Sequence, residues 1–278
     1  MPMTRLLHLS DTHFGTEQPE VVAALQRQCA AWRPTLAVLS GDVTQRARPE
    51  QFEAAVRFMD SLPVPARLVL PGNHDIPLFD LPRRLMRPYA SYQSAFGYAL
   101  EPVYSDGDWL VVTVNTTRWY RHKNGEVDPL QVSSVAERLR QAAPGQVRVV
   151  VTHHPLVVID EADQVNQPRH HQLALAAWAE AGVDLVLGGH IHLPYVTPVE
   201  PLGALDPAPG TPRPRRVWAV QAGTATSTRI REGIPNSVNL ITCDVHPYGR
   251  VCEVETWQFD AADGAFARVS QRTLALSD

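Results

Sequence analysis

The sequence predicts an α/β protein, and three observations support this. Short apolar runs alternate with stretches of helical periodicity as far as Leu70, which is the pattern of a sheet covered by helices. The segment 76–104 interrupts this alternation, and from Arg216 onward the pattern contains strands only. We expect a single domain over residues 1–278, with a lid or cap at 76–104 and a strand-rich C-terminal part at 215–278.

The first part of the chain predicts a βαβαβ unit. Short apolar runs predict strands at residues 6–10, 35–40 and 66–70. Apolar side chains near helical spacing, such as Val21, Leu25 and Cys29, support a helix at residues 19–32, and a similar pattern predicts one at 49–61. Because strands and helices alternate, the helices are expected to cover the sheet.

The remaining segments are less regular. Proline, arginine and aromatic residues crowd the segment 76–104, which is expected to form short helices and loops lying over another part of the protein. Strands are expected at residues 109–114, 147–151 and 183–187, and helices at 128–142 and 171–181. A loop rich in proline and glycine is expected at 201–214, followed by strands at 217–222, 237–245, 251–257 and 269–274.

The composition excludes several classes of protein. Lys and Arg number 25 against 29 Asp and Glu, so the net charge is −4 and there is no general field for nucleic acid. No apolar run reaches the ~18–20 residues of a membrane helix, and the apolar stretch at 6–9 is too short for a signal peptide. We expect a soluble, cytoplasmic protein with a small-molecule substrate; homo-oligomerisation stays open.

The three cysteines cannot form a framework of several disulfides. Cys243 and Cys252 flank the turn expected at residues 246–249. If that turn has four residues, the two thiols are neighbours on adjacent strands. Because a reducing compartment is expected, we predict that both are free thiols.

Five segments place polar side chains at the end of a predicted strand. They are Asp11-Thr12-His13, Gly41-Asp42, Gly72-Asn73-His74-Asp75, Thr152-His153-His154-Pro155 and Gly189-His190-Ile191-His192. Sites in open α/β sheets form beyond the carboxyl ends of the strands, so the five segments are expected to converge. In the first and last segments the paired residues are two apart, a spacing at which extended backbone points both side chains the same way.

These side chains suit metal ions. Imidazole nitrogens mixed with carboxylate and amide oxygens favour Mn, Fe, Zn or Ni, whereas sites made of oxygen alone favour Mg or Ca. A glycine precedes Asp42, Asn73 and His190, which permits the sharp turns and close backbone approach of a crowded site.

The five segments, in this order between residues 11 and 192, resemble those of the calcineurin-like metallophosphoesterases. The resemblance covers about the first two thirds of the chain, and the sequence is similar overall to the bacterial cyclic-nucleotide phosphodiesterase branch. It implies two facing mixed β-sheets flanked by helices. The C-terminal strands of residues 215–278 would then supply the second sheet's share of this sandwich.

The resemblance also implies a role for each residue. One metal would be held by Asp11, His13, Asp42 and His192. The second metal would be held by Asp42, Asn73, His153 and His190, with Asp42 bridging the two ions. His74 would protonate the leaving oxygen, and Asp75 would orient His74.

The charges agree with these roles. A carboxylate shared between two ions allows the ~3.5–4 Å separation of two-metal sites. Two divalent cations with two aspartates and one hydroxide leave the site with a net positive charge, which favours a phosphate anion. We hypothesise that a metal-bridging hydroxide attacks the phosphate ester in line, so that no nucleophilic Ser or Cys is needed.

Substrate contacts are harder to predict. His154 lies beside a predicted ligand, and Arg118 and His122 lie in a loop that follows a predicted strand. These three residues are candidates for substrate binding. Arginine is the usual phosphate clamp because its fork matches phosphate oxygens. The other candidates of this type, each more often solvated than bound, are Arg46, Arg83, Arg84, Arg121 and Arg229.

Four functions remain open, in this order of preference. The first is a phosphodiesterase for a cyclic nucleotide or a glycerophosphodiester. The second is a phosphomonoesterase, or a hydrolase of a nucleotide or lipid pyrophosphate, for which an apolar lid would be suitable. A nuclease is disfavoured by the acidic composition. A metal-binding scaffold without activity is disfavoured because no ligand of the pattern is missing.

Overall fold

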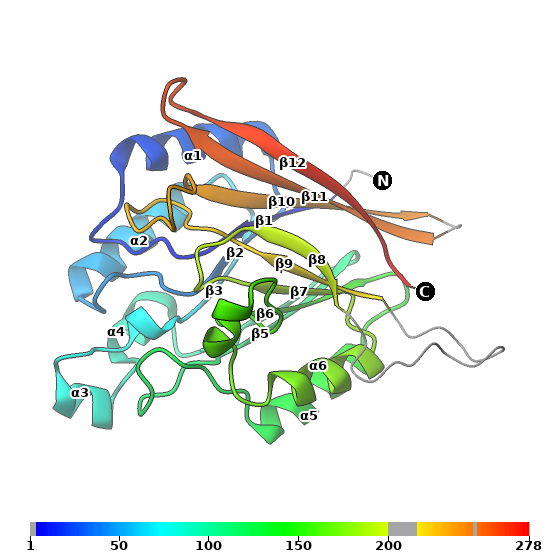
Figure 1. Cartoon of the computed structure of the whole chain (residues 1–278), viewed down its shortest axis with the longest axis horizontal. Coiled ribbons are helices and arrows are strands. Elements are labelled where there is room, and N and C mark those ends of the chain that lie inside the picture. Colours follow the sequence, from blue (N-terminus) through cyan, green and yellow to red (C-terminus); the bar gives the residue numbers. More distant parts are fainter. Residues whose placement is uncertain (1–3, 200–215, 247–248, 278) are drawn as a thin grey trace.

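The computed structural model describes residues 4–199, 216–246 and 249–277. The loop predicted at 201–214 and the centre of the turn predicted at 246–249 lie outside the described residues. Two mixed β-sheets, each with six strands, face one another and carry helices on their outer surfaces (Figure 1). This arrangement confirms the predicted class of fold.

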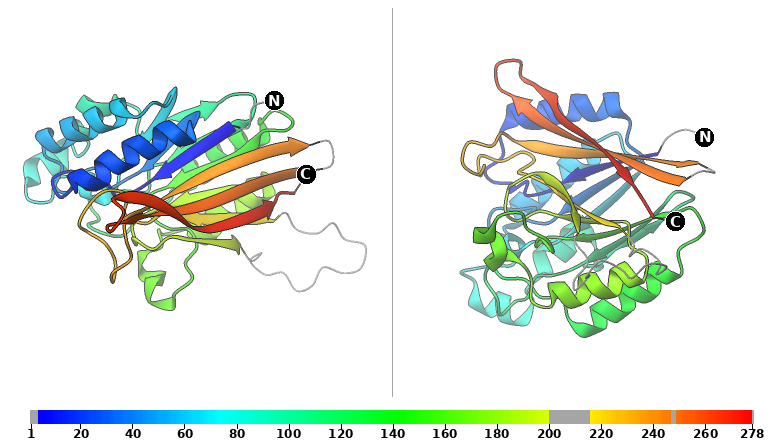
Figure 2. Two further views of the ribbon diagram at one scale, coloured as in Figure 1. Left: turned by 90° about the horizontal axis from the view of Figure 1, so that it is seen from above. Right: turned by 45° about the vertical axis from the view of Figure 1, so that its right-hand side comes forward.

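The first sheet has the strand order β12-β11-β10-β1-β2-β3. Its strands are β1 (Thr4–Leu9), β2 (Leu36–Ser40), β3 (Ala66–Leu70), β10 (Ser237–His246), β11 (Gly249–Asp260) and β12 (Ala265–Ala275). Strands β1 to β3 run parallel, whereas β10 pairs with β1 in the antiparallel sense. The long strands β10 to β12 therefore extend the sheet from the free edge of β1 (Figure 2).

The second sheet has the strand order β4-β5-β6-β7-β9-β8. Its strands are β4 (Val103–Ser105), β5 (Trp109–Val114), β6 (Val147–Thr152), β7 (Leu185–Gly188), β8 (Tyr195–Val199) and β9 (Val217–Gln221). The four central strands are parallel, and the two edge strands, β4 and β8, are antiparallel to their neighbours. Neither edge strand is predicted by the sequence, because both are short and β8 contains Pro198.

The C-terminal strands divide between the two sheets, which corrects one expectation. Only β9 joins the second sheet, while β10 to β12 complete the first. The physical reason lies in the edge of β1, whose backbone groups would be unpaired without a neighbour. The pairing of Leu6 with Ile241 and of Leu7 with Leu240 covers that edge with a mostly buried strand.

Four longer helices cover the outer surfaces of the sheets. They are α1 (Pro19–Trp32), α2 (Pro49–Ser61), α5 (Pro129–Arg140) and α6 (His171–Glu180). Three of them begin with proline, whose fixed φ suits the first helical position and whose missing N–H is not needed there. Among the described residues, none of the helices has both the length and the apolar character that crossing a bilayer demands.

The buried apolar residues form three layers. One layer lies between α1, α2 and the first sheet, and includes Leu25 and Phe52. A second fills the space between the sheets, and a third lies between the second sheet and helices α5 and α6. Because β2 and β5 are buried along their whole length, they read in the sequence as continuous apolar runs.

The segment 76–104 forms the predicted short helices, α3 (Leu81–Met86) and α4 (Ala90–Phe96). The two differ in packing. Helix α4 is anchored by the buried Tyr92, whose hydroxyl donates to the carbonyl of Val69 at 2.6 Å. Helix α3 has no buried residue and exposes Leu81, Leu85 and Met86. Helix α3 is therefore packed less tightly than α4.

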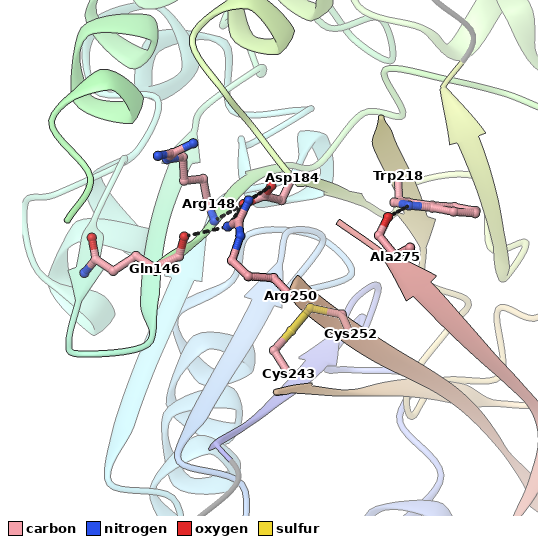
Figure 3. The surroundings of a disulfide bond; sticks show 8 residues. All are labelled: Gln146, Arg148, Asp184, Trp218, Cys243, Arg250, Cys252 and Ala275. Carbon is pink, nitrogen blue, oxygen red and sulfur yellow. Dashed lines mark hydrogen bonds and ion pairs between the residues drawn. A yellow bond between two sulfur atoms is a disulfide. The ribbon is translucent and has the colours of Figure 1, made fainter. Parts of the chain in front are cut away.

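Cys243 and Cys252 lie opposite one another on β10 and β11, as the turn prediction requires. They form a disulfide, with their Cα atoms 4.1 Å apart (Figure 3), so the prediction of free thiols is wrong for this pair. The bond is possible because directly opposed residues of antiparallel strands bring their side chains together. Only Cys29, which is buried in α1, remains a thiol. The cysteines therefore give no support to a reducing compartment.

A buried ion pair joins the two sheets close to this disulfide (Figure 3). The guanidinium of Arg250, on β11, donates to both carboxylate oxygens of Asp184 at 2.9 Å. It also donates to the carbonyl of Gln146 at 3.0 Å. Gln146 and Asp184 come just before β6 and β7, so this contact lies at the end of the sheets opposite their carboxyl ends.

Candidate metal centre

The carboxyl ends of strands from both sheets meet at one site. The first sheet supplies Asp11 and His13 after β1, Asp42 after β2 and Asn73 after β3. The second sheet supplies His153 after β6, and His190 and His192 after β7. All seven predicted ligands lie in one contiguous cluster.

One group of side chains consists of Asp11, His13 and His192. The Nε2 atom of His192 lies 3.2 Å from Oδ1 of Asp11 and 3.2 Å from Nε2 of His13. The Nε2 atom of His13 lies 3.8 Å from the same Asp11 oxygen. These three donors therefore face a common point.

A second group consists of Asp42, His153 and His190, with Asn73 beside it. The Nε2 atom of His153 lies 3.3 Å from Oδ1 of Asp42 and 3.2 Å from Oδ1 of Asn73. The other oxygen of Asp42, Oδ2, lies 3.7 Å from Nε2 of His13, which belongs to the first group. The two carboxylate oxygens of Asp42 are thus directed at different groups.

The arrangement fits metal ions better than it fits protein contacts alone. Asp11 and Asp42 are almost completely buried, and Oδ1 of Asp11 has no hydrogen-bond donor. Burying two carboxylates is costly unless positive charge compensates them. Burial lowers the pKa of His13 to about 3 despite the nearby aspartates, so this imidazole is neutral, as a metal ligand must be. The donor set therefore suits divalent cations.

Hydrogen bonds fix the orientation of the histidine rings. Nδ1 of His153 donates to the carbonyl of Ser40 at 2.9 Å, which leaves Nε2 directed into the cluster. Nδ1 of His74 donates to the carbonyl of Gln45, also at 2.9 Å. The backbone N–H of His74 donates to Oδ1 of Asp42 at 2.8 Å, so His74 is held at the edge of the cluster. Because the acceptors for the two rings are backbone carbonyls, the residue types in the sequence do not reveal them.

Five of the seven predicted ligands have a backbone that non-glycine residues seldom adopt. Their φ angles are 54° at Asp11, 42° at His13, 46° at Asp42, 73° at His190 and 56° at His192. Such left-handed conformations cost free energy and concentrate at functional sites. The rest of the fold therefore maintains strain in order to direct these side chains into one cluster.

All three glycines predicted to permit close approach do so. At Gly41 a Cβ would lie 2.5 Å from Nδ1 of His153. The other two glycines face the aspartates. A Cβ on Gly72 would lie 2.1 Å from the backbone nitrogen of Asp42. A Cβ on Gly189 would lie 1.8 Å from Oγ of Ser10 and 2.5 Å from Oδ2 of Asp11. No larger residue fits at either position without moving an aspartate of the cluster.

Asp75 lies elsewhere than the resemblance implies. Its carboxylate accepts hydrogen bonds from the backbone N–H groups of Val43, Thr44 and Gly72 and from the hydroxyl of Thr44, at 2.8 to 3.0 Å. Burial and the nearby Asp42 raise its pKa to about 6 against the effect of these donors. None of its hydrogen bonds goes to the His74 ring. Asp75 instead ties the loop after β2, which carries Gln45, to the loop after β3.

Two of the three candidate substrate contacts are used elsewhere. His154 is fully buried; Nδ1 is hydrogen-bonded to the hydroxyl of Thr116, and Nε2 donates to the carbonyl of Lys123. Arg118 donates to Asp128 and Gln131 at the start of α5. Both residues therefore shape the loop around residues 118–126. The third candidate, His122, lies at the pocket described next.

A pocket of about 460 Å³ opens beside His74 and Asn73. Three of the arginines considered from the sequence line it, namely Arg46, Arg83 and Arg229. Arg84 and Arg121 do not, because Arg84 donates to the carbonyl of Arg121, and Arg121 pairs with Glu126 at 3.2 Å. The pocket also contains Lys123, which the sequence pattern did not single out.

Comparison with known proteins places the chain in a family. The family model described as calcineurin-like phosphoesterase matches residues 4–194. A glycerophosphodiester phosphodiesterase, GpdQ of Enterobacter lignolyticus, is 32% identical over 81 residues, which is 25% of this chain and 29% of that protein. A probable cyclic nucleotide phosphodiesterase of Synechococcus sp. is 25% identical over 167 residues, 59% of this chain and 60% of that protein. The matches therefore span less than two thirds of either relative.

Solved structures share the fold. The purple acid phosphatase PPD1 of yellow lupin has a TM-score of 0.71 at 12% identity, covering 98% of this chain and 54% of that one. A dimetal phosphatase of Danio rerio has a TM-score of 0.64 at 12% identity, covering 100% of both chains. Such identities show the fold alone, whereas the family match rests on sequence. The chain belongs to the calcineurin-like phosphoesterase family.

Proposed function

We propose that the chain is a phosphodiesterase that depends on two divalent metal ions. The substrate would be a small phosphodiester of the cyclic nucleotide or glycerophosphodiester type. The position of Asp42 carries the proposal, because Oδ1 faces His153 of one donor group while Oδ2 faces His13 of another. The names of the two sequence relatives, both phosphodiesterases, favour a diester over a monoester.

Each side chain of the cluster has a part in this proposal. Asp11, His13, Asp42 and His192 would hold one ion, and Asp42, Asn73, His153 and His190 the other. When bound, such ions supply positive charge to the phosphate and lower the pKa of water, which yields a nucleophile near neutral pH. The mixed nitrogen and oxygen donors are suited to Mn, Fe, Zn or Ni.

His74 is proposed as the group that protonates the leaving oxygen. Its Nδ1 proton is held by the carbonyl of Gln45, so Nε2 remains available for proton transfer. His74 also lines the pocket, which supports the proposal that the leaving alcohol occupies this space. A positioned acid of this kind contributes roughly 10²–10⁴-fold to a rate. Asp75 acts on His74 indirectly, by fixing the loop that carries Gln45.

The test compares bis-p-nitrophenyl phosphate with p-nitrophenyl phosphate in the presence of Mn, Fe, Zn, Ni or Mg in turn. We expect faster turnover of the diester, dependence on added metal, and two ions per chain by metal analysis. Asp42→Asn should abolish both metal binding and turnover, while Asp60→Asn, the same change at an exposed position, should affect neither. Faster monoester turnover, or metal-free activity, would overturn the proposal.

A second candidate function is hydrolysis of a phosphomonoester or of a nucleotide or lipid pyrophosphate. The apolar side chains that α3 exposes beside the pocket favour a lipid-bearing substrate for such an enzyme. Faster turnover of the monoester in the comparison above would support it. In either case we propose that residues 1–278 act as one domain, with 76–104 as the cap beside the pocket.

A further inference from the structure

The pocket beside His74 is basic, although the chain as a whole is acidic. Its lining includes five permanent cations and a single carboxylate, Asp80. The cations are Arg46, Arg48, Arg83, Lys123 and Arg229. Asp80 is engaged in starting α3, where it accepts a hydrogen bond from the backbone N–H of Arg83 at 3.1 Å. The pocket therefore has an excess of positive charge, although the whole chain has a net charge of −4.

Two of these cations are partly buried without a carboxylate partner. Arg83 and Arg229 are half-buried, and among the described residues neither forms an ion pair with Asp or Glu. Within the described part of the chain, the guanidinium of Arg229 donates only to the side-chain oxygen of Gln45, at 3.2 Å. A partly desolvated guanidinium attracts an anion strongly, because its fork matches phosphate oxygens.

The two arginines occupy different parts of the pocket. Arg229 is connected to the metal cluster through Gln45, the residue whose carbonyl orients His74. Arg83 lies on α3 and also lines the next groove, between α2 and α4. Beside them, Phe79 is 76% exposed, and the Arg46 guanidinium lies 5.5 Å from its ring centroid. A substrate with only one phosphate, bound at the metal cluster, would therefore leave Arg83 without a counter-charge.

We infer that the natural substrate is a phosphodiester whose leaving alcohol carries a second phosphate, and that Arg83 and Lys123 bind this second phosphate. The inference rests on the proposed function, in which His74 protonates the leaving oxygen and so assigns the pocket to the leaving alcohol. The apolar surface of Phe79 contacts the carbon skeleton of that alcohol. Alcohols that carry a quaternary ammonium are disfavoured, because the pocket would repel them.

The test measures competition against bis-p-nitrophenyl phosphate in the metal-loaded enzyme. The competitors are glycerophosphoinositol and glycerophosphoinositol 4-phosphate, which differ by one phosphate. We expect the phosphorylated compound to have an inhibition constant at least about tenfold lower. In Arg83→Gln and in Lys123→Gln this advantage should shrink severalfold. Arg87→Gln, an exposed position just beyond α3 that does not line the pocket, is the matched control and should keep the advantage.

Each outcome decides between the alternatives. Equal inhibition by the two compounds in the unmodified enzyme overturns the inference while leaving the phosphodiesterase proposal intact. An advantage that survives in both Arg83→Gln and Lys123→Gln also overturns it, since the extra phosphate would then bind at the metals. Absence of any diester turnover with every metal refutes the proposed function itself. Circular dichroism spectra of the three variants show whether each one folds.

Discussion

Asp75 shows how a single carboxylate can position a proposed catalytic group, His74, that it does not touch. Its four hydrogen bonds hold the loops after β2 and β3 in register, and one of these loops presents the carbonyl that orients His74. The carboxylate is an acceptor only, which suits a position surrounded by donors. In an asparagine at this position, the amide NH2 would replace one carboxylate oxygen. That group donates hydrogen bonds, so it would face the surrounding N–H and O–H groups instead of accepting from them.

Asp75→Asn should therefore lower the free energy of unfolding by about 2–3 kcal/mol, because buried N–H groups lose their acceptor. It should also lower turnover, since the loop of Gln45 shifts. Asp80→Asn is the matched control, because asparagine caps a helix nearly as well as aspartate and the cost should stay below about 0.5 kcal/mol. Denaturant unfolding measures the free energy of unfolding of both variants. Equal losses in the two variants would contradict this account.

Gly72 offers a test of how crowded the metal centre is. In Gly72→Ala the new methyl group would collide with the backbone of Asp42, which cannot move without carrying the carboxylate with it. We expect Mn affinity, measured by calorimetry, to fall at least about tenfold, as for other changes that misplace metal ligands. Gly107→Ala adds the same methyl group where no atom lies within 4 Å, and should leave the affinity unchanged. Wild-type affinity in Gly72→Ala would refute the steric argument.

The convergence of the seven candidate ligands could be predicted because each one follows an apolar strand and carries a donor typical of metal sites. The left-handed backbone at His13 and His190 could not, since the sequence shows no sign of it. The directions of the His154 and Arg118 side chains could not be predicted for a related reason. Their residue types suit a phosphate, but hydrogen bonds to Thr116 and Gln131 direct them elsewhere, and such partners are fixed only by the tertiary structure.

Secondary-structure elements with a strong local pattern of apolar residues could be predicted from the sequence. The bounds of α1, α2, β3 and β5 agree with the prediction, because a proline starts each helix and the strands are short apolar runs. The edge strands β4 and β8 were missed, since they have few buried residues to give a pattern. The hairpin of β10 and β11 was predicted in the correct register, whereas the chemistry of its cysteines was not.

The disulfide of this hairpin gives a prediction that involves neither metal nor substrate. Titration in denaturant without reductant should detect one thiol, that of Cys29, and titration after reduction should detect three. Cys252→Ala should lower the free energy of unfolding by about 2 kcal/mol, because the unfolded chain gains freedom. Metal affinity should not change, since no ligand of the cluster lies on this hairpin. Three thiols before reduction would show that the bond is absent.

The two sheets are held together by charge as well as by apolar contact. The Arg250 and Asp184 pair is buried, bidentate and placed at the end of the sheets opposite the metal cluster. Removing Arg250 takes both guanidinium hydrogen bonds from the buried Asp184 carboxylate, and breaking a buried ion pair from one side typically costs about 3–5 kcal/mol. Replacing both by apolar residues removes that penalty.

Arg250→Met alone should therefore destabilise the protein by about 3–5 kcal/mol, and Arg250→Met combined with Asp184→Leu should recover part of the loss. Arg268→Met is the matched control, because it breaks an ion pair with Glu255 in which the arginine side chain is 47% exposed, and it should cost less than about 1 kcal/mol. Urea unfolding of all three variants supplies the comparison. A double variant less stable than Arg250→Met would contradict the argument.

Which sheet each C-terminal strand joins could not be predicted. Local pattern identifies β9 and β10 as strands, but their partners lie far away in the sequence, and nothing local distinguishes the free edge of β1 from that of β7. The family resemblance gave the pair of sheets correctly and the allocation of strands wrongly. Long-range pairing of this kind depends on which edges remain open after the rest of the chain has packed.

Because β1 pairs with β10, the first sheet cannot be completed until β10 has been synthesised. Thr4 pairs with Cys243, so β1 leaves the ribosome long before β10, the strand that covers its edge. Until then the nascent chain carries an open strand edge on an apolar sheet, which is a template for pairing with other chains. The candidate metal ligands, the last of which is His192, are all synthesised before that edge is covered. A nascent chain can therefore contain every candidate metal ligand while its first sheet is still open to aggregation.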